Sequence, residues 1–252
     1  MNQRAQLRSF GDNLNVAVVG GTGGIGAALV DQLSYCPFVD TVLVLSRIER
    51  SSPNPRHKSI TIDLEDEDGI ARAALAAKNA VETLSLVIVA TGLLHDGAGF
   101  QPERSWKELS PDSLLRAFQV NAFGPLLVAK HFLPLLDKNR KSVFAALSAR
   151  VGSIEDNRLG GWYAYRSSKA ALNMFIRTLS IELSRRNSNG ICVGLHPGTV
   201  DTTLSKPFQR NVPLNDLKSP AQSAGQLLDV LDVLSPEDTG AVFAWDGQRI
   251  PF

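Results

Sequence analysis

Strand-length apolar runs alternate with helix-length segments along almost the whole chain, and this alternation limits its possible folds more than any other feature. The expected strands are rich in aliphatic and β-branched residues and span 15–20, 41–46, 59–64, 84–90, 142–147, 190–196 and 240–245. The expected helices span 24–34, 68–79, 111–137, 162–187 and 220–234, the last with Ser219 as cap and Pro220 in its first turn. Strict alternation predicts parallel strands joined by crossover helices.

Two of the expected strands are apolar without a break, Val42-Leu-Val-Leu45 and Leu86-Val-Ile-Val89. Strands need such runs when a parallel sheet is covered on both faces. We therefore expect an α/β fold of the Rossmann type, a doubly wound parallel sheet of about seven strands with helices on both faces. No linker or repeat divides the sequence, so residues 1–252 are expected to form a single domain, with a candidate substrate loop at about 200–218.

Composition excludes several kinds of partner. Hydrophobic residues make up 44% and charged residues 20% of the chain, and the formal net charge is +1, so we expect a small-molecule ligand and no nucleic acid. Cys36 and Cys192 lack metal-ligand spacing and are interpreted as core residues, and no metal is expected. Residues 1–15 are polar, and no run reaches the roughly 18 apolar residues of a membrane span. The sequence therefore predicts a soluble cytoplasmic protein with no membrane segment.

Glycines crowd the turn between the first expected strand and the first expected helix. The turn contains Gly20, Thr22, Gly23, Gly24, Ile25 and Gly26. Glycine permits a tight turn and close approach of the backbone to a pyrophosphate, while the helix N-terminus offers free N–H groups. We expect a dinucleotide phosphate site here. The alternative, that glycine only packs helix against strand, accounts for one glycine but not for five within seven residues.

The second expected strand ends in Ser46-Arg47, where an NAD site usually has an acidic side chain. An arginine suits the 2'-phosphate of NADP, and Arg50 is near enough to assist, so NADP is favoured over NAD. The alternative is an arginine solvated at a strand end. Asp63 and Leu64 close the third strand, where the carboxylate either accepts from an adenine amino group or caps the following helix.

Tyr165 and Lys169 lie four residues apart at the head of the fourth expected helix, so their side chains share one face. A nearby ammonium favours the phenolate and lowers the pKa of a tyrosine toward the range of a general acid or base. The pair is therefore suited to deliver a proton to a carbonyl oxygen. The alternative is a chance spacing on an amphipathic helix, with both side chains reaching water.

Four motifs, in this order, resemble the short-chain dehydrogenase/reductase family over nearly the whole chain. They are Gly20-xxx-Gly24-x-Gly26, Asn121 within Phe118-Gln-Val-Asn-Ala-Phe-Gly124, Tyr165-xxx-Lys169, and Pro197-Gly-Thr-Val-Asp-Thr202. The segment Val151-Gly-Ser-Ile154, followed by Gly160-Gly-Trp-Tyr-Ala-Tyr165, is most similar to the branch that contains C-factor-like and sniffer-type carbonyl reductases.

The resemblance implies a nicotinamide-dependent oxidoreductase. It makes Tyr165 the acid/base, Lys169 the group that lowers its pKa and holds the nicotinamide ribose, and Asn121 the holder of a proton-relay water. The alternative for Asn121 is a buried amide that pins its helix to a neighbouring element. The resemblance also places the cofactor against Ala90, Thr91, Gly92, Pro197, Gly198, Val200 and Thr202.

The family serine near the end of the fifth expected strand has no clear counterpart. The sequence there is Ser148-Ala-Arg-Val-Gly152, which puts Ala149 at the usual position. Neighbouring strand residues face opposite sides, so Ser148 takes the role only with a bulge or turn in the backbone. We expect Ser148 to serve, with Ser153 as the second candidate.

The stretch after the fourth expected strand also departs from the family. The usual Asn-Asn-Ala-Gly is Val89-Ala-Thr-Gly92 here, so two side-chain amides are missing. Thr91 is expected to take over part of their hydrogen bonding, at a cost of about a kcal/mol for each bond lost.

Three segments that follow strand ends, 93–99, 151–161 and 200–208, are expected to line the substrate cavity. Trp162, Leu204 and Phe208 favour an apolar or aromatic carbonyl compound, although such residues also serve as loop anchors. His95 and Asp96 are alternative catalytic residues, but an isolated histidine in a glycine-bounded loop is more often solvated.

The function expected from these features is NADP(H)-dependent reduction of a small carbonyl compound to an alcohol, or the reverse. The alternative, favoured by Ala149, is a catalytically weak nucleotide-binding regulatory or signalling protein. A sugar-nucleotide epimerase or dehydratase is disfavoured, because the region after Pro197 is short for a substrate domain. The helix at 162–187 is apolar nearly all round, and Ala170 and Ala171 permit close approach, so we expect a homodimer or homotetramer.

Overall fold

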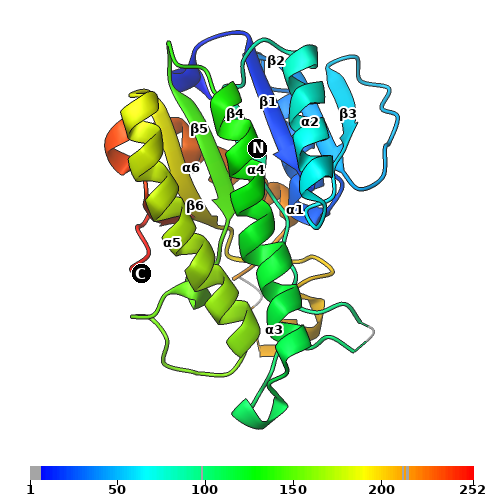
Figure 1. The fold of residues 1–252 in the computed structure, drawn as a ribbon, viewed down its shortest axis with the longest axis vertical. Coiled ribbons are helices and arrows are strands. Elements are labelled where there is room, and N and C mark those ends of the chain that lie inside the picture. The colour runs from blue at the N-terminus through cyan, green and yellow to red at the C-terminus, as the bar shows by residue number, and fades with distance from the viewer. Residues whose placement is uncertain (1–6, 98, 212, 214–215) are drawn as a thin grey trace.

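Seven parallel strands form the central sheet of the computed structural model, which describes residues 7–97, 99–211, 213 and 216–252 (Figure 1). The strands lie side by side in the order β3-β2-β1-β4-β5-β6-β9. Their bounds are β1 Leu14–Val19, β2 Val39–Ser46, β3 His57–Thr61, β4 Leu86–Val89, β5 Ser142–Leu147, β6 Gly190–His196 and β9 Val242–Ala244. Every neighbouring pair is parallel, as the alternation of strands and helices predicts.

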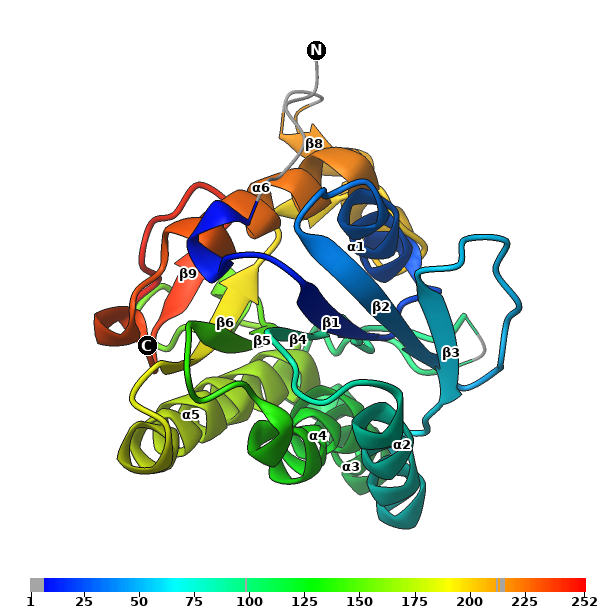
Figure 2. The same cartoon turned by 90° about the horizontal axis from the view of Figure 1, so that it is seen from above.

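Helices cover both faces of the sheet (Figure 2). On one face lie α1 (Gly24–Ser34) and α6 (Pro220–Val233), and on the other lie α2 (Glu67–Ala80), α4 (Gly124–Phe132) and α5 (Tyr163–Arg186). A further helix, α3 (Pro111–Phe118), precedes α4 and packs against α5. The expected doubly wound Rossmann-type fold is confirmed.

Each inner strand contributes side chains to two apolar cores, one on either side of the sheet. Val16 and Val18 of β1 belong to the core under α1 and α6, while Ala17 and Val19 belong to the core under α2, α4 and α5. Both sets are almost completely buried. This two-sided burial explains why the strands are apolar without a break. Cys36 and Cys192 are buried among these residues, as expected.

The strand order reverses between β1 and β4, because β2 and β3 extend to one side of β1 while β5, β6 and β9 extend to the other side of β4. Crossovers that leave in opposite directions open a crevice at the carboxyl ends of the two strands where the order reverses. The glycine turn follows β1, and the Ala90–Thr91–Gly92 stretch follows β4. The fold therefore brings two of the predicted binding segments to one crevice.

The helix expected over 111–137 forms a continuous helical run from Pro111 to Leu135, but it is not regular. It consists of α3, a π-helical turn at Gln119–Phe123, α4, and a 3-10 turn at Leu133–Leu135. Pro125 explains the π-helical turn, because it has no N–H to donate and in a regular α-helix its ring would clash with the carbonyl of Asn121. The other expected elements are correct to within a few residues at their ends.

A short two-stranded parallel ribbon, β7 (Thr199–Val200) and β8 (Leu217–Lys218), was not expected and closes the base of the candidate substrate loop. Residues 212, 214 and 215 of that loop, residue 98 of the segment 93–99, and residues 1–6 of the polar N-terminal segment lie outside the described residues. Within the described part of the chain, no helix combines the length and hydropathy that crossing a bilayer requires.

Candidate active site

A cavity of about 620 Å³ opens at the carboxyl ends of β1, β4 and β5. Most of the side chains predicted for cofactor and chemistry line it, and they come from seven separate segments of the chain. They are Gly20, Thr22, Gly23, Gly24, Ile25, Ser46, Arg47, Asp63, Leu64, Ala90, Thr91, Gly92, Ser148, Tyr165, Lys169, Pro197 and Thr202. Four predicted residues do not line it, namely Gly26, Asn121, Gly198 and Val200.

The glycine turn is held tightly against β2. The backbone N–H groups of Gly20 and Gly21 both donate to the carbonyl of Leu45, at 2.8 and 3.2 Å, and Gly20 has a φ of +79°. A Cβ on Gly26 would lie 2.1 Å from the Gly20 carbonyl oxygen. Gly26 therefore lets α1 pack close beneath the turn and does not line the cavity, and its contact with a cofactor stays a prediction.

The first turn of α1 borders the cavity. Gly23 is the cap residue and has no side chain to accept from the N–H groups of this turn, and Gly23, Gly24 and Ile25 all line the cavity. A Cβ on Gly24 would lie 2.6 Å from Cγ2 of Thr202, so only glycine lets this turn approach the chain after β6. An uncapped helix N-terminus of this kind favours a bound anion.

The segments after β2 and β3 form one side of the cavity. Arg47 is exposed and forms no ion pair with any residue that the structure describes. Ser46 donates its hydroxyl to the carbonyl of Ile48 at 2.6 Å. The carboxylate of Asp63 accepts from the Glu65 N–H at 3.1 Å, and the cap of α2 is Asp66, so the alternative of Asp63 as helix cap is wrong.

Tyr165 and Lys169 project from the first two turns of α5 into the cavity. The Lys169 side chain is 2% exposed, and its Nζ donates to the carbonyl of Leu147 at 2.7 Å. This Nζ lies 5.9 Å from the centre of the Tyr165 ring. The alternative in which both side chains reach water is therefore wrong for the lysine.

Burial sets the proton affinity of both groups. It raises the pKa of Tyr165 to about 12 and lowers the pKa of Lys169 to about 7. The lowering of the tyrosine pKa that the resemblance implies is thus opposed by burial within the protein. At neutral pH, Tyr165 is therefore protonated, whereas Lys169 is close to the midpoint of its titration.

Asn121 lies in the π-helical turn, completely buried behind the cavity wall. Its Nδ2 donates to the Leu93 carbonyl at 2.8 Å and to the Ser168 hydroxyl at 3.1 Å, and its Oδ1 accepts from the Leu93 N–H at 2.8 Å. The amide pins the chain after β4 to α5, as the alternative interpretation holds. A Cβ on Gly92 would lie 3.8 Å from Asn121 Oδ1 and 3.9 Å from Lys169 Nζ, so both groups adjoin Gly92.

Of the three positions considered for the family serine, only Ser148 lines the cavity. It faces α5, where its hydroxyl donates to Asn173 Oδ1 at 2.6 Å. Ser153 is buried and accepts from the Asp156 N–H, while Ala149 presents a methyl group only. The structure thus brings Ser148 to the cavity, with its proton committed to Asn173.

The hydroxyl of Thr91 is buried and has no hydrogen-bond partner among the described residues. The expectation that it replaces the missing asparagine bonds within the protein is therefore wrong. Thr91 lines the cavity, so its hydroxyl is available to a ligand there.

The far end of the cavity is formed by His95, Asp96 and Leu204 from two of the three segments predicted to hold substrate. Trp162 and Phe208 stand behind this wall, with ring centres 4.9 Å apart, and Trp162 lies edge-on to Tyr165 at 6.3 Å. Phe208 in turn lies edge-on to His95 at 5.8 Å. Trp162 and Phe208 therefore support the start of α5 and the loop and do not themselves line the cavity.

Several lining residues were not predicted. They are Val19, Ile62, Glu65, Arg116, Val120 and Leu147. Most adjoin predicted positions at strand ends, and that adjacency was the available signal. Arg116 and Val120 lie four residues apart in the helical region, a spacing that puts both on one face. Arg116 forms an ion pair with Asp96 at 2.5 Å.

Comparison with known proteins identifies the family that this chain resembles. The profile of the short chain dehydrogenase family matches residues 14–213. An uncharacterized oxidoreductase of Schizosaccharomyces pombe is 31% identical over 255 residues, covering 93% of this chain and 96% of the relative. The C-signal protein of Myxococcus xanthus is 39% identical over 139 residues, covering 55% of this chain and 78% of that protein.

Among solved structures, the NADPH-bound carbonyl reductase from chicken fatty liver has a TM-score of 0.84 at 24% identity, covering 97% of each chain. The carbonyl reductase Sniffer of Drosophila melanogaster has a TM-score of 0.81 at 22% identity, covering 96% of this chain and 100% of that one. At these identities the likeness shows the fold. Because the family profile spans most of the sequence, the chain belongs to the short-chain dehydrogenase/reductase family.

Proposed function

We propose that this protein is an NADP(H)-dependent oxidoreductase that reduces a small carbonyl compound to an alcohol, or runs the reverse reaction, with Tyr165 as acid/base. One observation carries the proposal: α5 holds Tyr165 and Lys169 in the same cavity that the glycine turn and Arg47 line. Proton chemistry and a dinucleotide site thus share one crevice. Membership of an oxidoreductase family supports this assignment.

Three features of the cavity fit NADP. The uncapped first turn of α1 suits the pyrophosphate. The guanidinium of Arg47 suits the 2'-phosphate, and the hydroxyl of Thr91 suits a polar group of the dinucleotide, since neither group is paired with another of the described residues. Lys169 would hold the nicotinamide ribose. When bound, the reduced nicotinamide supplies the hydride that a carbonyl carbon accepts. The chicken carbonyl reductase of the same fold, solved with NADPH, supports the choice of cofactor.

Tyr165 supplies the proton in the direction of reduction. Negative charge develops on the carbonyl oxygen as its carbon is reduced, and a donor aimed at that oxygen stabilises the charge. With its pKa raised to about 12, the Tyr165 hydroxyl keeps its proton at neutral pH and is ready to donate. The reverse reaction requires the phenolate, which a protonated Lys169 favours.

A second function, nucleotide-dependent signalling with weak catalysis, is favoured by one observation. The hydroxyl proton of Ser148 is committed to Asn173, and Ala149 offers no hydroxyl at all. A site with Tyr165 as its one substrate-directed donor is weaker than one with two. The similarity to the Myxococcus C-signal protein supports this second function.

Turnover separates the two functions. We expect the wild type to oxidise NADPH in the presence of at least one member of a panel of aldehydes, ketones and quinones. Tyr165→Phe is expected to lower kcat by roughly two to four powers of ten, because it removes the donor and leaves the ring. Tyr163→Phe, the same chemical change two residues earlier on α5, is the matched control. Absence of turnover across the panel, unchanged by Tyr165→Phe, would establish the signalling function instead.

We also propose that the protein assembles as a homodimer or homotetramer through α5. Met174 and Ile181 are 64% and 45% exposed on its outer face, although Arg177, Thr178 and Glu182 make that face less apolar than the sequence suggested. Sedimentation at micromolar concentration tests the assembly, and a monomer alone would contradict it.

A further inference from the structure

The helix that carries the proposed acid/base starts in a strained conformation. Trp162, the residue before α5, has φ 51° and ψ 44°, a left-handed conformation that non-glycine residues rarely adopt. Its side chain accepts no capping hydrogen bond from the first turn. Tyr165 is the third residue of α5, so its hydroxyl depends on a turn that lacks a cap of its own.

Glu103 supplies that cap from a distant part of the chain. Its backbone carbonyl accepts from the Trp162 N–H at 2.6 Å, and its carboxylate Oε2 accepts from the Ala164 N–H at 3.1 Å. Glu103 is 3% exposed and lies on the loop between β4 and α3, 61 residues before Ala164. A carboxylate at a helix N-terminus is favoured by both the free N–H groups and the helix dipole.

The loop that carries Glu103 is anchored against the same turn. Phe100 packs with Ala164 of α5 and Ala117 of α3 in a small apolar cluster. Gly161 has a φ of +65°, and a Cβ there would lie 3.4 Å from the Glu103 carbonyl oxygen. The backbone before α5 therefore runs directly alongside Glu103.

We propose that Glu103 is a positioning residue, which holds the first turn of α5 so that Tyr165 stands at the correct place in the cavity. The inference rests on the proposed function, because it assigns Glu103 a part in the reaction of Tyr165. Lys169 needs no such support, since its own bond to Leu147 fixes it to β5. Trp162, held by Glu103, also lies edge-on to the Tyr165 ring and limits its movement.

The bonding of Glu103 indicates which replacement preserves its role. Its Oε1 is buried and has no hydrogen-bond partner among the described residues, so the capping is done by one oxygen. Glutamine keeps one acceptor oxygen of the same reach, whereas alanine removes it. Glu103→Gln is therefore the conservative variant and Glu103→Ala the disruptive one.

The experiment combines steady-state kinetics with hydrogen exchange of peptides that cover 163–167. We expect Glu103→Ala to lower kcat about tenfold, because small displacements of a reacting group are costly, while the KM for NADPH changes by less than about twofold. The same variant should exchange the amides of the first turn faster than wild type. Glu103→Gln should restore kcat to within about threefold of wild type.

Asp137→Ala is the matched control, since it removes a buried carboxylate at the opposite end of the sheet. Equal loss of kcat in this control would show a general effect of destabilisation and overturn the proposal. Unchanged exchange at 163–167 in Glu103→Ala would also overturn it. A wild type without turnover would end the proposed function, yet the exchange result would still decide whether Glu103 holds the turn.

Discussion

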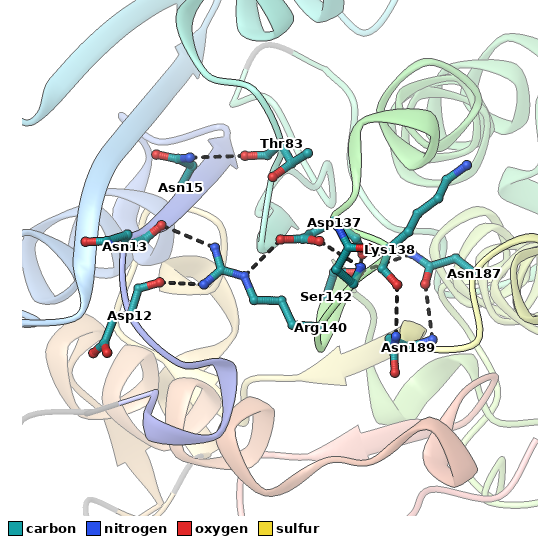
Figure 3. A network of polar contacts seen from close by, with 11 residues as sticks. Asp12, Asn13, Asn15, Thr83, Asp137, Lys138, Arg140, Ser142, Asn187 and Asn189 are labelled. Carbon is teal, nitrogen blue, oxygen red and sulfur yellow. Dashed lines mark hydrogen bonds and ion pairs between the residues drawn. The ribbon is translucent and has the colours of Figure 1, made fainter.

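Polar side chains differ in their hydrogen bonding between the two ends of the central sheet. At the amino end, a network joins the starts of β1, β5 and β6 (Figure 3). Asp137 accepts from Arg140 and from the Asn139 N–H, each at 2.9 Å, and its carbonyl accepts from Asn187. Arg140 also donates to the carbonyls of Asp12 and Asn13. The Asp137 carboxylate and the Arg140 guanidinium are thus bonded to other groups of the protein.

At the carboxyl end, buried polar atoms remain without partners among the described residues. They are Thr91 Oγ1, His95 Nδ1, Glu103 Oε1, Asn173 Nδ2 and His196 Nδ1. Buried groups of this kind are costly to a fold and are normally paired. Four further atoms of this kind, Ser85 Oγ, Gln32 Oε1, His131 Nε2 and Gln226 Oε1, belong to other parts of the molecule. The amino end thus stabilises the fold, whereas the carboxyl end is arranged for a ligand.

Asp137→Ala should give the largest effect on stability. It leaves the Nε–H of Arg140 and the N–H of Asn139 without their acceptor, so the free energy of unfolding should fall by roughly 2–3 kcal/mol, with kcat unchanged in the folded protein. Denaturant unfolding monitored by circular dichroism measures the change. Asp12→Ala is the matched control, because only the backbone carbonyl of Asp12 enters the network. Equal losses in the two variants would contradict a role for the Asp137 carboxylate.

Arg47→Asp should act at the carboxyl end and affect binding without affecting stability. The change replaces attraction by repulsion at the 2'-phosphate, so the affinity for NADPH should fall about thirty- to a hundredfold while that for NADH changes little. Fluorescence titration with each dinucleotide measures both values. Arg185→Asp, on the exposed last turn of α5, controls for net charge. Equal losses for the two dinucleotides would remove the assignment of NADP.

Regular spacing of residues in the sequence predicted the sheet, the glycine turn and the pair Tyr165–Lys169. Periodicity determines strands and helices, and strand ends determine the crevice, so most lining residues could be found before the structure. A turn pattern does not, however, distinguish a glycine that faces a ligand from one that packs beneath the turn, as Gly26 does against the Gly20 carbonyl.

The remaining features depend on contacts between distant segments. Glu103 and Asn121 act on α5 through hydrogen bonds that span 61 and 47 residues. No local sequence pattern indicates partners so far apart. The direction of the Tyr165 pKa depends on burial, which the spacing of two side chains does not reveal. The π-helical turn within the expected helix at 111–137 could have been found, because Pro125 marks it in the sequence.

Lys169→Met should change how stability depends on pH. The pKa of Lys169 is about 7 in the folded protein and near 10.5 when unfolded, so the unfolded chain binds more protons between these values. Wild-type stability should therefore rise with pH above about 7, by at most about 1.4 kcal/mol per unit from this group. Lys169→Met should flatten the rise between about pH 7 and 8.5. Denaturant unfolding at several pH values measures it, with exposed Lys138→Met as control. Parallel curves for wild type and Lys169→Met would contradict the shifted pKa.

Ser148→Ala should give the smallest effect. It tests whether the Ser148 hydroxyl, at the carboxyl end of the sheet, serves stability or the reaction. The hydroxyl proton goes to Asn173, so its loss leaves a buried amide unpaired and should lower stability by about 1 kcal/mol. Because that proton is not aimed at a substrate, kcat should fall less than about tenfold, far less than in Tyr165→Phe. Ser153→Ala, a buried serine outside the cavity wall, is the control. A loss of kcat as large as that of Tyr165→Phe would show that the serine turns its proton to the substrate, and would place the family serine at Ser148 despite the alanine beside it.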